Sequence, residues 1–107
     1  MALSNKTLVG TNAAVASAGT AVTPTTAPFD NTHTIIVYNE DSSNTIYIAF
    51  TDDSSIPVAD AVFVPAGATI TLAIGPKSAR PPVGAFKVDA SGGTPTARIT
   101  YVNGTQT

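Results

Sequence analysis

The sequence predicts an all-β protein, a small antiparallel β-sandwich or jelly-roll-like barrel with an extended N-terminal arm. Three observations lead to this prediction. The chain has 107 residues, which is enough for one domain with one core. From His33 onward, short segments in which apolar and polar residues alternate recur roughly every 8 to 12 residues. Pro, Gly, Asn and Ser separate these segments, and these residues are typical of turns.

The first 30 residues are predicted to form the arm, and residues 31–107 the sandwich domain. Residues 11–28 contain no charge, no aromatic side chain and no helical periodicity. Pro24 and Pro28 cannot donate backbone hydrogen bonds, which favours an extended path. Alanines in residues 13–18 leave a short helical turn as an alternative. The arm is expected to lie either on its own domain or on a neighbouring subunit.

Two strands with a polar turn between them are predicted first. Residues 33–39 carry apolar side chains on both faces, which indicates a central strand covered on both sides, or a strand whose outer face meets a partner. Residues 45–50 alternate in the same way, and the intervening residues are polar. We interpret the pair as a β-hairpin.

The remaining strands follow at similar spacing. Residues 62–64 precede a Pro65–Gly67 turn, and residues 69–74 form the most regular alternation in the chain. Residues 75–84 contain three prolines and two glycines, so they are predicted to form a loop. Two further strands are predicted around Phe86 and Val88 and around Ala97, Ile99 and Tyr101.

Composition excludes several classes of function. Charged residues make up only 11% of the chain, and the five basic residues are scattered, so no phosphate-binding patch for nucleic acid is expected. There is no apolar run of about 18 residues, so no membrane span is expected. Polar residues interrupt the stretch 6–18, which argues against a signal peptide. Because few charges repel one another, copies can pack side by side, and a homo-oligomer is expected.

No catalytic set is recognisable, so we expect no enzyme activity and no cofactor. The chain has no cysteine, one histidine (His33), no G-x-S-x-G motif and no glycine-rich phosphate-binding loop. Carboxylates occur as the adjacent pairs Glu40-Asp41 and Asp52-Asp53. We consider three interpretations of these carboxylates. They are solvated turn residues, a weak calcium site with Asp41, Asp52 and Asp53 as ligands, or a glycosidase-type carboxylate pair.

Candidate partner contacts come from two regions. The loop could present Arg80 stiffened by Pro81 and Pro82, or it could be a plain surface loop. The apolar residues of the arm are the other candidates, namely Leu8, Val9, Val15, Val22 and Phe29. Three tyrosines are either sugar-stacking platforms or half-buried packing residues, namely Tyr38, Tyr47 and Tyr101.

The stretch from HTIIVYNEDSSNTIYIAFTDD through VFVPAGATITLAIG, residues 33–75, resembles small virion structural proteins of tailed bacteriophages, of the capsid decoration or cement type. The resemblance implies a jelly-roll-like module without catalytic residues. It also implies a homotrimer on the capsid surface that bridges neighbouring subunits, with the major capsid protein or another virion protein as partner. Residues 2–29 would then be the reaching arm. The alternative is a carbohydrate-binding or adhesin module of a tail or fibre.

Overall fold

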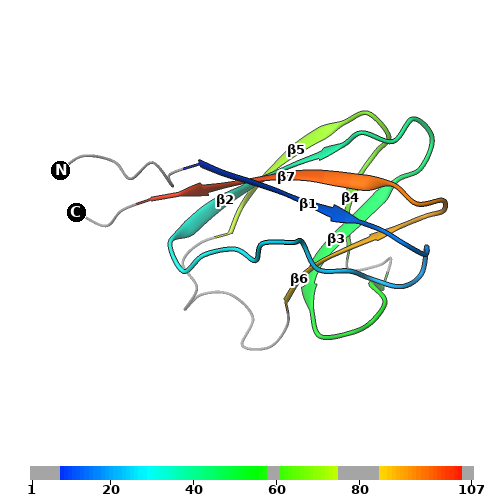
Figure 1. The fold of residues 1–107 in the computed structure, drawn as a ribbon, viewed down its shortest axis with the longest axis horizontal. Coiled ribbons are helices and arrows are strands. Elements are labelled where there is room, and N and C mark those ends of the chain that lie inside the picture. The colour runs from blue at the N-terminus through cyan, green and yellow to red at the C-terminus, as the bar shows by residue number, and fades with distance from the viewer. Residues whose placement is uncertain (1–7, 58–60, 75–84, 105–107) are drawn as a thin grey trace.

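The computed structural model describes residues 8–57, 61–74 and 85–104, which fold into two antiparallel β-sheets (Figure 1). The four-stranded sheet A has the order β1 (Leu8–Ala14), β7 (Thr96–Asn103), β2 (Thr32–Asn39), β5 (Thr69–Ala73). The three-stranded sheet B has the order β4 (Val62–Val64), β3 (Ile46–Thr51), β6 (Ala85–Ala90). The predicted all-β, antiparallel two-sheet architecture is confirmed. No helix in this part of the chain is long and apolar enough to cross a membrane.

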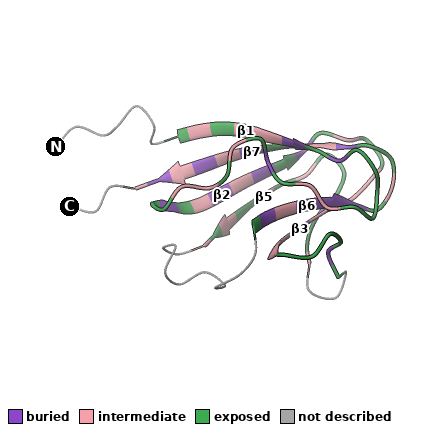
Figure 2. Cartoon of the chain, turned by 60° about the horizontal axis from the view of Figure 1, so that its bottom comes forward, coloured by how far each residue is buried: buried purple, intermediate pink, exposed green. Residues whose placement is uncertain are grey.

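The core lies between the two sheets because alternate residues of each strand point inward. The burial pattern of β7 alternates residue by residue, as Figure 2 shows for several strands. Ile35 and Val37 of β2 and Ile46 and Ile48 of β3 are at most 1% exposed. The other large side chains of this core come from β4, β6, β7 and the segment after β1, namely Val64, Phe86, Val88, Ile99, Tyr101 and Val15.

Strand β2 is central, as the apolar residues on both of its faces indicate. It pairs with β7 on one side and with β5 on the other. Its outward residue Ile36 is half-buried, and Tyr38 is 40% exposed.

The predicted β-hairpin between residues 33–39 and 45–50 is wrong. Strand β2 belongs to sheet A and β3 to sheet B, so the two strands face each other across the core and do not pair. The buried Asn39 side chain stabilises this crossing, because its amide nitrogen donates to the carbonyl oxygens of Asn44 and Val64 at 2.8 and 2.9 Å. The alternation of apolar and polar residues identifies which side chains are buried, but it does not identify which strands pair with each other.

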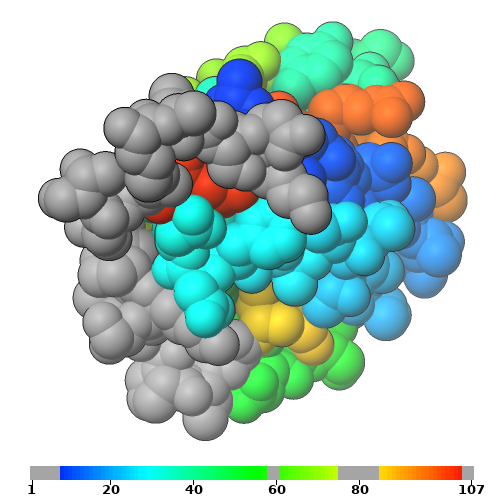
Figure 3. Space-filling model, turned by 60° about the vertical axis from the view of Figure 1, so that its left-hand side comes forward, coloured from blue at the N-terminus to red at the C-terminus, as the bar shows by residue number. Residues whose placement is uncertain are grey.

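The stretch assigned to the arm lies on its own domain from residue 8 onward. Strand β1 pairs along its whole length with β7. The backbone N–H of Val15 then donates to Pro95, and Val22 forms an isolated antiparallel bridge to Val88 of β6. Figure 3 shows this blue to cyan segment lying across one side of the sandwich. Residues 13–18 contain the end of β1 and a turn, so the helical alternative is wrong.

Candidate interaction surfaces

The candidate residues His33, Asp41, Asp52 and Asp53 do not form one cluster. His33 is exposed, and its Nδ1 lies 2.9 Å from the hydroxyl oxygen of the adjacent Thr34. Within residues 8–57, 61–74 and 85–104, no three His, Cys, Asp or Glu side chains gather into a group that could hold a metal ion.

The calcium candidates lie at opposite ends of one strand. Asp41 precedes β3, whereas Asp52 and Asp53 follow it, and the six residues of β3 span roughly 20 Å. The Asp41 carboxylate accepts hydrogen bonds from the backbone N–H groups of Ser43 and Asn44 at 3.0 and 2.6 Å. These bonds stabilise the charged form and lower the pKa of Asp41. The structure therefore gives Asp41 a role in the turn and does not bring the three carboxylates together.

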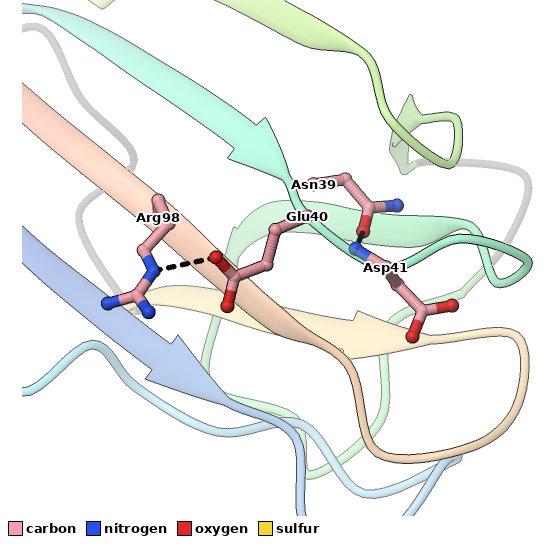
Figure 4. Close-up of polar contacts among 4 residues, drawn as sticks. All are labelled: Asn39, Glu40, Asp41 and Arg98. Carbon is pink, nitrogen blue, oxygen red and sulfur yellow. Dashed lines mark hydrogen bonds and ion pairs between the residues drawn. The ribbon is translucent and has the colours of Figure 1, made fainter.

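The outer face of sheet A is broad and carries little charge. The registers of its four strands place these residues on it: Leu8, Gly10, Asn12, Ala14, Thr96, Arg98, Thr100, Val102, Thr34, Ile36, Tyr38, Thr69, Thr71 and Ala73. Arg98 is the charged residue of this set, and its Nε donates to Oε2 of Glu40 at 2.9 Å (Figure 4). The hydrogen bond from Arg98 to Glu40 raises the pKa of the Arg98 guanidinium. The face is therefore rich in hydroxyl and apolar groups, and its one cation is already paired.

On the outer face of sheet B, the half-buried Tyr47 packs against the exposed Phe63. The rings of Tyr47 and Phe63 lie 5.0 Å apart at an interplanar angle of 50°, and Phe63 is 47% exposed. The three tyrosines thus differ. Tyr47 is half-buried, as the packing interpretation predicts, and Tyr101 is fully buried, whereas Tyr38 is 40% exposed. Tyr38 and Tyr47 lie on opposite outer faces of the sandwich.

The predicted partner residues of the arm differ in how much surface they offer. Leu8 is 63% exposed and Val9 half-buried, whereas Val15 is 1% exposed and fills the core of its own domain. Val22 and Phe29 pack against that core, and the Phe29 ring meets Tyr101 edge-on at 6.3 Å. Of the five, Leu8 offers the most surface to a partner. Arg80, Pro81 and Pro82 lie outside the described residues.

Sequence reasoning missed a cavity between the sheets. It has a volume of about 400 Å³, and part of its wall is formed by β5 and the residue that follows it. Leu72 and Ile74 line it from sheet A, and Ile48, Phe50 and Phe86 line it from sheet B. The alternation of Ile70, Leu72 and Ile74 predicts an inward face. Only the strand order shows that this face lies at a sheet edge, where it stays partly exposed.

Comparison with known proteins adds no relatives to this description. No protein-family model, no curated protein and no solved structure matches the chain.

Proposed function

We propose that this chain is a virion structural protein that decorates or cements a phage capsid by bridging neighbouring capsid subunits. The observation that supports an assembly role is the outer face of sheet A, on which four strands present hydroxyl and apolar groups and one paired cation. The capsid setting, the major capsid protein as partner and the trimeric state rest on the resemblance of residues 33–75 to decoration proteins.

Such a face suits close packing against protein. A partner would desolvate few charges, and Thr hydroxyl groups can exchange hydrogen bonds with water for hydrogen bonds with a partner. Each contact can be weak, because a shell repeats it many times and binding at one subunit raises the effective concentration at the next. Protein packing, rather than charge, would then stabilise the shell.

The location of the arm changes how bridging is tested. Deleting residues 2–28 would remove β1 and the buried Val15, so the truncated chain would lose part of its own sheet and core. In the proposal, the contacts therefore come from exposed side chains of sheet A, with Leu8 and Tyr38 as the largest apolar ones. Point substitutions at these two positions spare the fold.

The test is binding to empty capsids of the virus that encodes the chain. The purified protein is expected to co-sediment with capsids at a saturating number of copies per capsid subunit. Leu8→Asp and Tyr38→Asp should each weaken binding about tenfold or more, since each would bury an unpaired carboxylate. The matched control is Ser55→Asp, at an exposed position in the segment that follows β3. Absence of co-sedimentation, or binding that all three variants retain equally, would contradict the proposal.

The aromatic pair supports a second candidate, a carbohydrate-binding or adhesin module. The exposed Phe63 and the half-buried Tyr47 form an aromatic surface on sheet B, and sugar rings stack on such surfaces. This function predicts that the melting temperature rises with a bound glycan and falls back in Phe63→Ala. A melting temperature unchanged by a panel of glycans and by calcium would count against it.

A further inference from the structure

The two sheets have four edge strands, and three of them are covered or short. The backbone N–H of Thr25 donates to the carbonyl of Asn12, and that of Thr26 donates to the Thr11 hydroxyl, so a loop runs beside β1. The bridge between Val22 and Val88 covers the edge of β6. Strand β4 has three residues.

Strand β5 is an edge strand that is neither short nor protected by its own sequence. It has five residues, contains no charge, no proline and no bulge, and lies at the end of sheet A. Natural proteins commonly protect an edge strand with one of these devices or with a covering segment. Among the hydrogen bonds of the described part of the chain, none joins another segment to the free side of β5. Within residues 8–57, 61–74 and 85–104, this edge has no hydrogen-bonded neighbour on its outer side.

The hydrogen-bond register shows which groups the edge presents. The N–H of Ile74 donates to His33, and the carbonyl of Ala68 accepts from Asn39, so residues of even number in this strand bond to β2. The N–H and C=O groups of a strand residue point to the same side, and neighbouring residues point to opposite sides. Thr69, Thr71 and Ala73 therefore direct three donors and three acceptors away from the sheet.

This edge is complementary to itself. If a second copy lies antiparallel with Thr71 opposite Thr71, then Thr69 of one copy lies opposite Ala73 of the other. Each of these three pairs exchanges two N–H···O=C bonds, so all six donors and all six acceptors are paired. On the inner face, Ile70 of one copy meets Leu72 of the other. No like charges face each other, and Thr–Thr and aliphatic cross-strand pairs are stabilising.

The cavity beneath the edge adds an apolar driving force. Leu72 and Ile74 line the 400 Å³ space, and Ile70, Leu72 and Ile74 are only partly buried in the single chain. Because hydrogen bonds formed on association replace hydrogen bonds to water, their net contribution is modest. Covering these three side chains removes apolar surface from water and so favours association.

We propose that two copies of this chain pair through β5 about a two-fold axis at Thr71, joining their four-stranded sheets into one eight-stranded sheet. The pairing does not depend on the capsid setting, but it gives the free chain a two-fold dimer in place of the trimer that the resemblance implies. It also leaves β1 and Tyr38 free for other partners. Five residues a side form a contact smaller than the about 1,600 Å² of a standard interface, so we expect a dissociation constant of roughly 10 to 1,000 μM.

The test begins with the molar mass of the full chain. Sedimentation equilibrium over a concentration series should show a reversible rise from 10.8 kDa toward twice that mass. A chain that stays at 10.8 kDa up to about 1 mM would overturn the proposal.

Substitutions at Thr71 then locate the contact. Thr71→Pro removes an N–H that points away from β2, so β5 keeps its bonds to β2 while the dimer loses two hydrogen bonds at its centre. We expect the dissociation constant to rise about tenfold or more, and Thr71→Val, which keeps the N–H, to stay within about threefold. Circular dichroism and the melting temperature check that each variant is folded.

A charged variant keeps the proposal testable if Thr71→Pro fails to fold. Thr71→Lys places two ammonium groups opposite each other at the two-fold axis and should also weaken the dimer. Thr94→Lys makes the same change in an exposed turn outside the edge and should not. A dimer unaffected by Thr71→Lys would overturn the proposed contact.

Spin labels provide a direct geometric readout. The chain has no cysteine, so Thr71→Cys carries a single nitroxide. In the paired sheet the two labels lie on directly opposed residues whose Cα atoms are about 5.5 Å apart, and strong dipolar broadening is expected at high concentration. A label at Thr100→Cys lies on β7. In the paired sheet it is five strand spacings, roughly 24 Å, from the same label in the second copy, so its spectrum should show no dipolar broadening. A dimer or trimer whose label at position 71 shows no broadening would overturn the proposal without bearing on capsid binding.

Discussion

The hydroxyl of Tyr101 donates a hydrogen bond to the carbonyl oxygen of Thr26 across 2.7 Å. Tyr101 is a fully buried residue of β7, whereas Thr26 belongs to the segment that leads from β1 to β2. The bond therefore anchors this segment to the core and keeps it beside the edge of β1. Together with the pairing of β1 and β7, it keeps residues 8–30 on the sandwich, although their sequence has no strong apolar periodicity.

The first prediction concerns the buried phenol. Burial raises the pKa of Tyr101, whereas the unfolded chain titrates near pH 10. A raised folded pKa gives stability that is fully present below about pH 10 and is lost as the pH rises toward the folded pKa. Tyr101→Phe should lower the free energy of unfolding by about 1 kcal/mol near neutral pH, because the Thr26 carbonyl loses its hydrogen-bond donor. The same substitution should also reduce the loss of stability at alkaline pH. Urea unfolding at about pH 8 and pH 11 measures both effects.

The matched control is Tyr38→Phe, which removes a hydroxyl from a side chain that is 40% exposed. It should leave stability near neutral pH within about 0.5 kcal/mol. Equal costs for the two substitutions would contradict the assigned role of Tyr101.

The second prediction separates core from surface among the arm residues. Val15→Ala should lower the free energy of unfolding by about 2 kcal/mol, because it deletes two buried methyl groups and leaves a cavity. Leu8→Ala should change it by less than about 0.5 kcal/mol, since Leu8 is 63% exposed. Chemical denaturation measures both values. A neutral Val15→Ala would show that the segment leaves the domain in solution.

The third prediction concerns the link between the sheets. Asn39 is fully buried, donates to the carbonyls of Asn44 and Val64, and accepts the backbone N–H of Asp41 at 3.0 Å. Figure 4 shows its side chain directed at Asp41. Asn39→Ala should lower the free energy of unfolding by about 2 to 3 kcal/mol, because it leaves buried backbone groups without hydrogen-bond partners. Asn12→Ala, at a half-buried position of β1, is the control and should cost less than half as much.

The fourth prediction concerns how stability depends on pH in the acidic range. The N–H groups of Ser43 and Asn44 lower the pKa of Asp41, so the stabilisation they provide is present above the pKa of the unfolded chain and is lost as the pH falls through the folded pKa. An NMR titration should place the Asp41 pKa below the usual value of about 3.9. Asp41→Asn should abolish this part of the acid dependence. A normal pKa for Asp41 would show that the turn does not form in solution.

Alternation predicted the parts of the fold whose inward residues are large. Ile35 and Val37 in β2, and Ile99 and Tyr101 in β7, identify these strands without any knowledge of their neighbours. The sequence predicts an arm where strand β1 lies, because the inward residues of β1 include Thr11 and Ala13. Their small or polar side chains give no apolar periodicity.

The candidate surfaces were harder to predict because they depend on strand order. The spacing of Thr69, Thr71 and Ala73 predicts an outward face, but an unpaired edge exists only because β5 ends sheet A. Likewise, the residues that line the cavity come from three distant parts of the sequence, and only the packing of the two sheets brings them together.

The sharpest test of the proposed capsid role is a cryo-electron microscopy reconstruction of empty capsids, assembled from the major capsid protein that the proposal names as partner and incubated with an excess of the purified chain. We expect additional density on the outer surface, in which the two-sheet domain bridges neighbouring capsid subunits through sheet A. A reconstruction identical to that of the untreated capsids would contradict it.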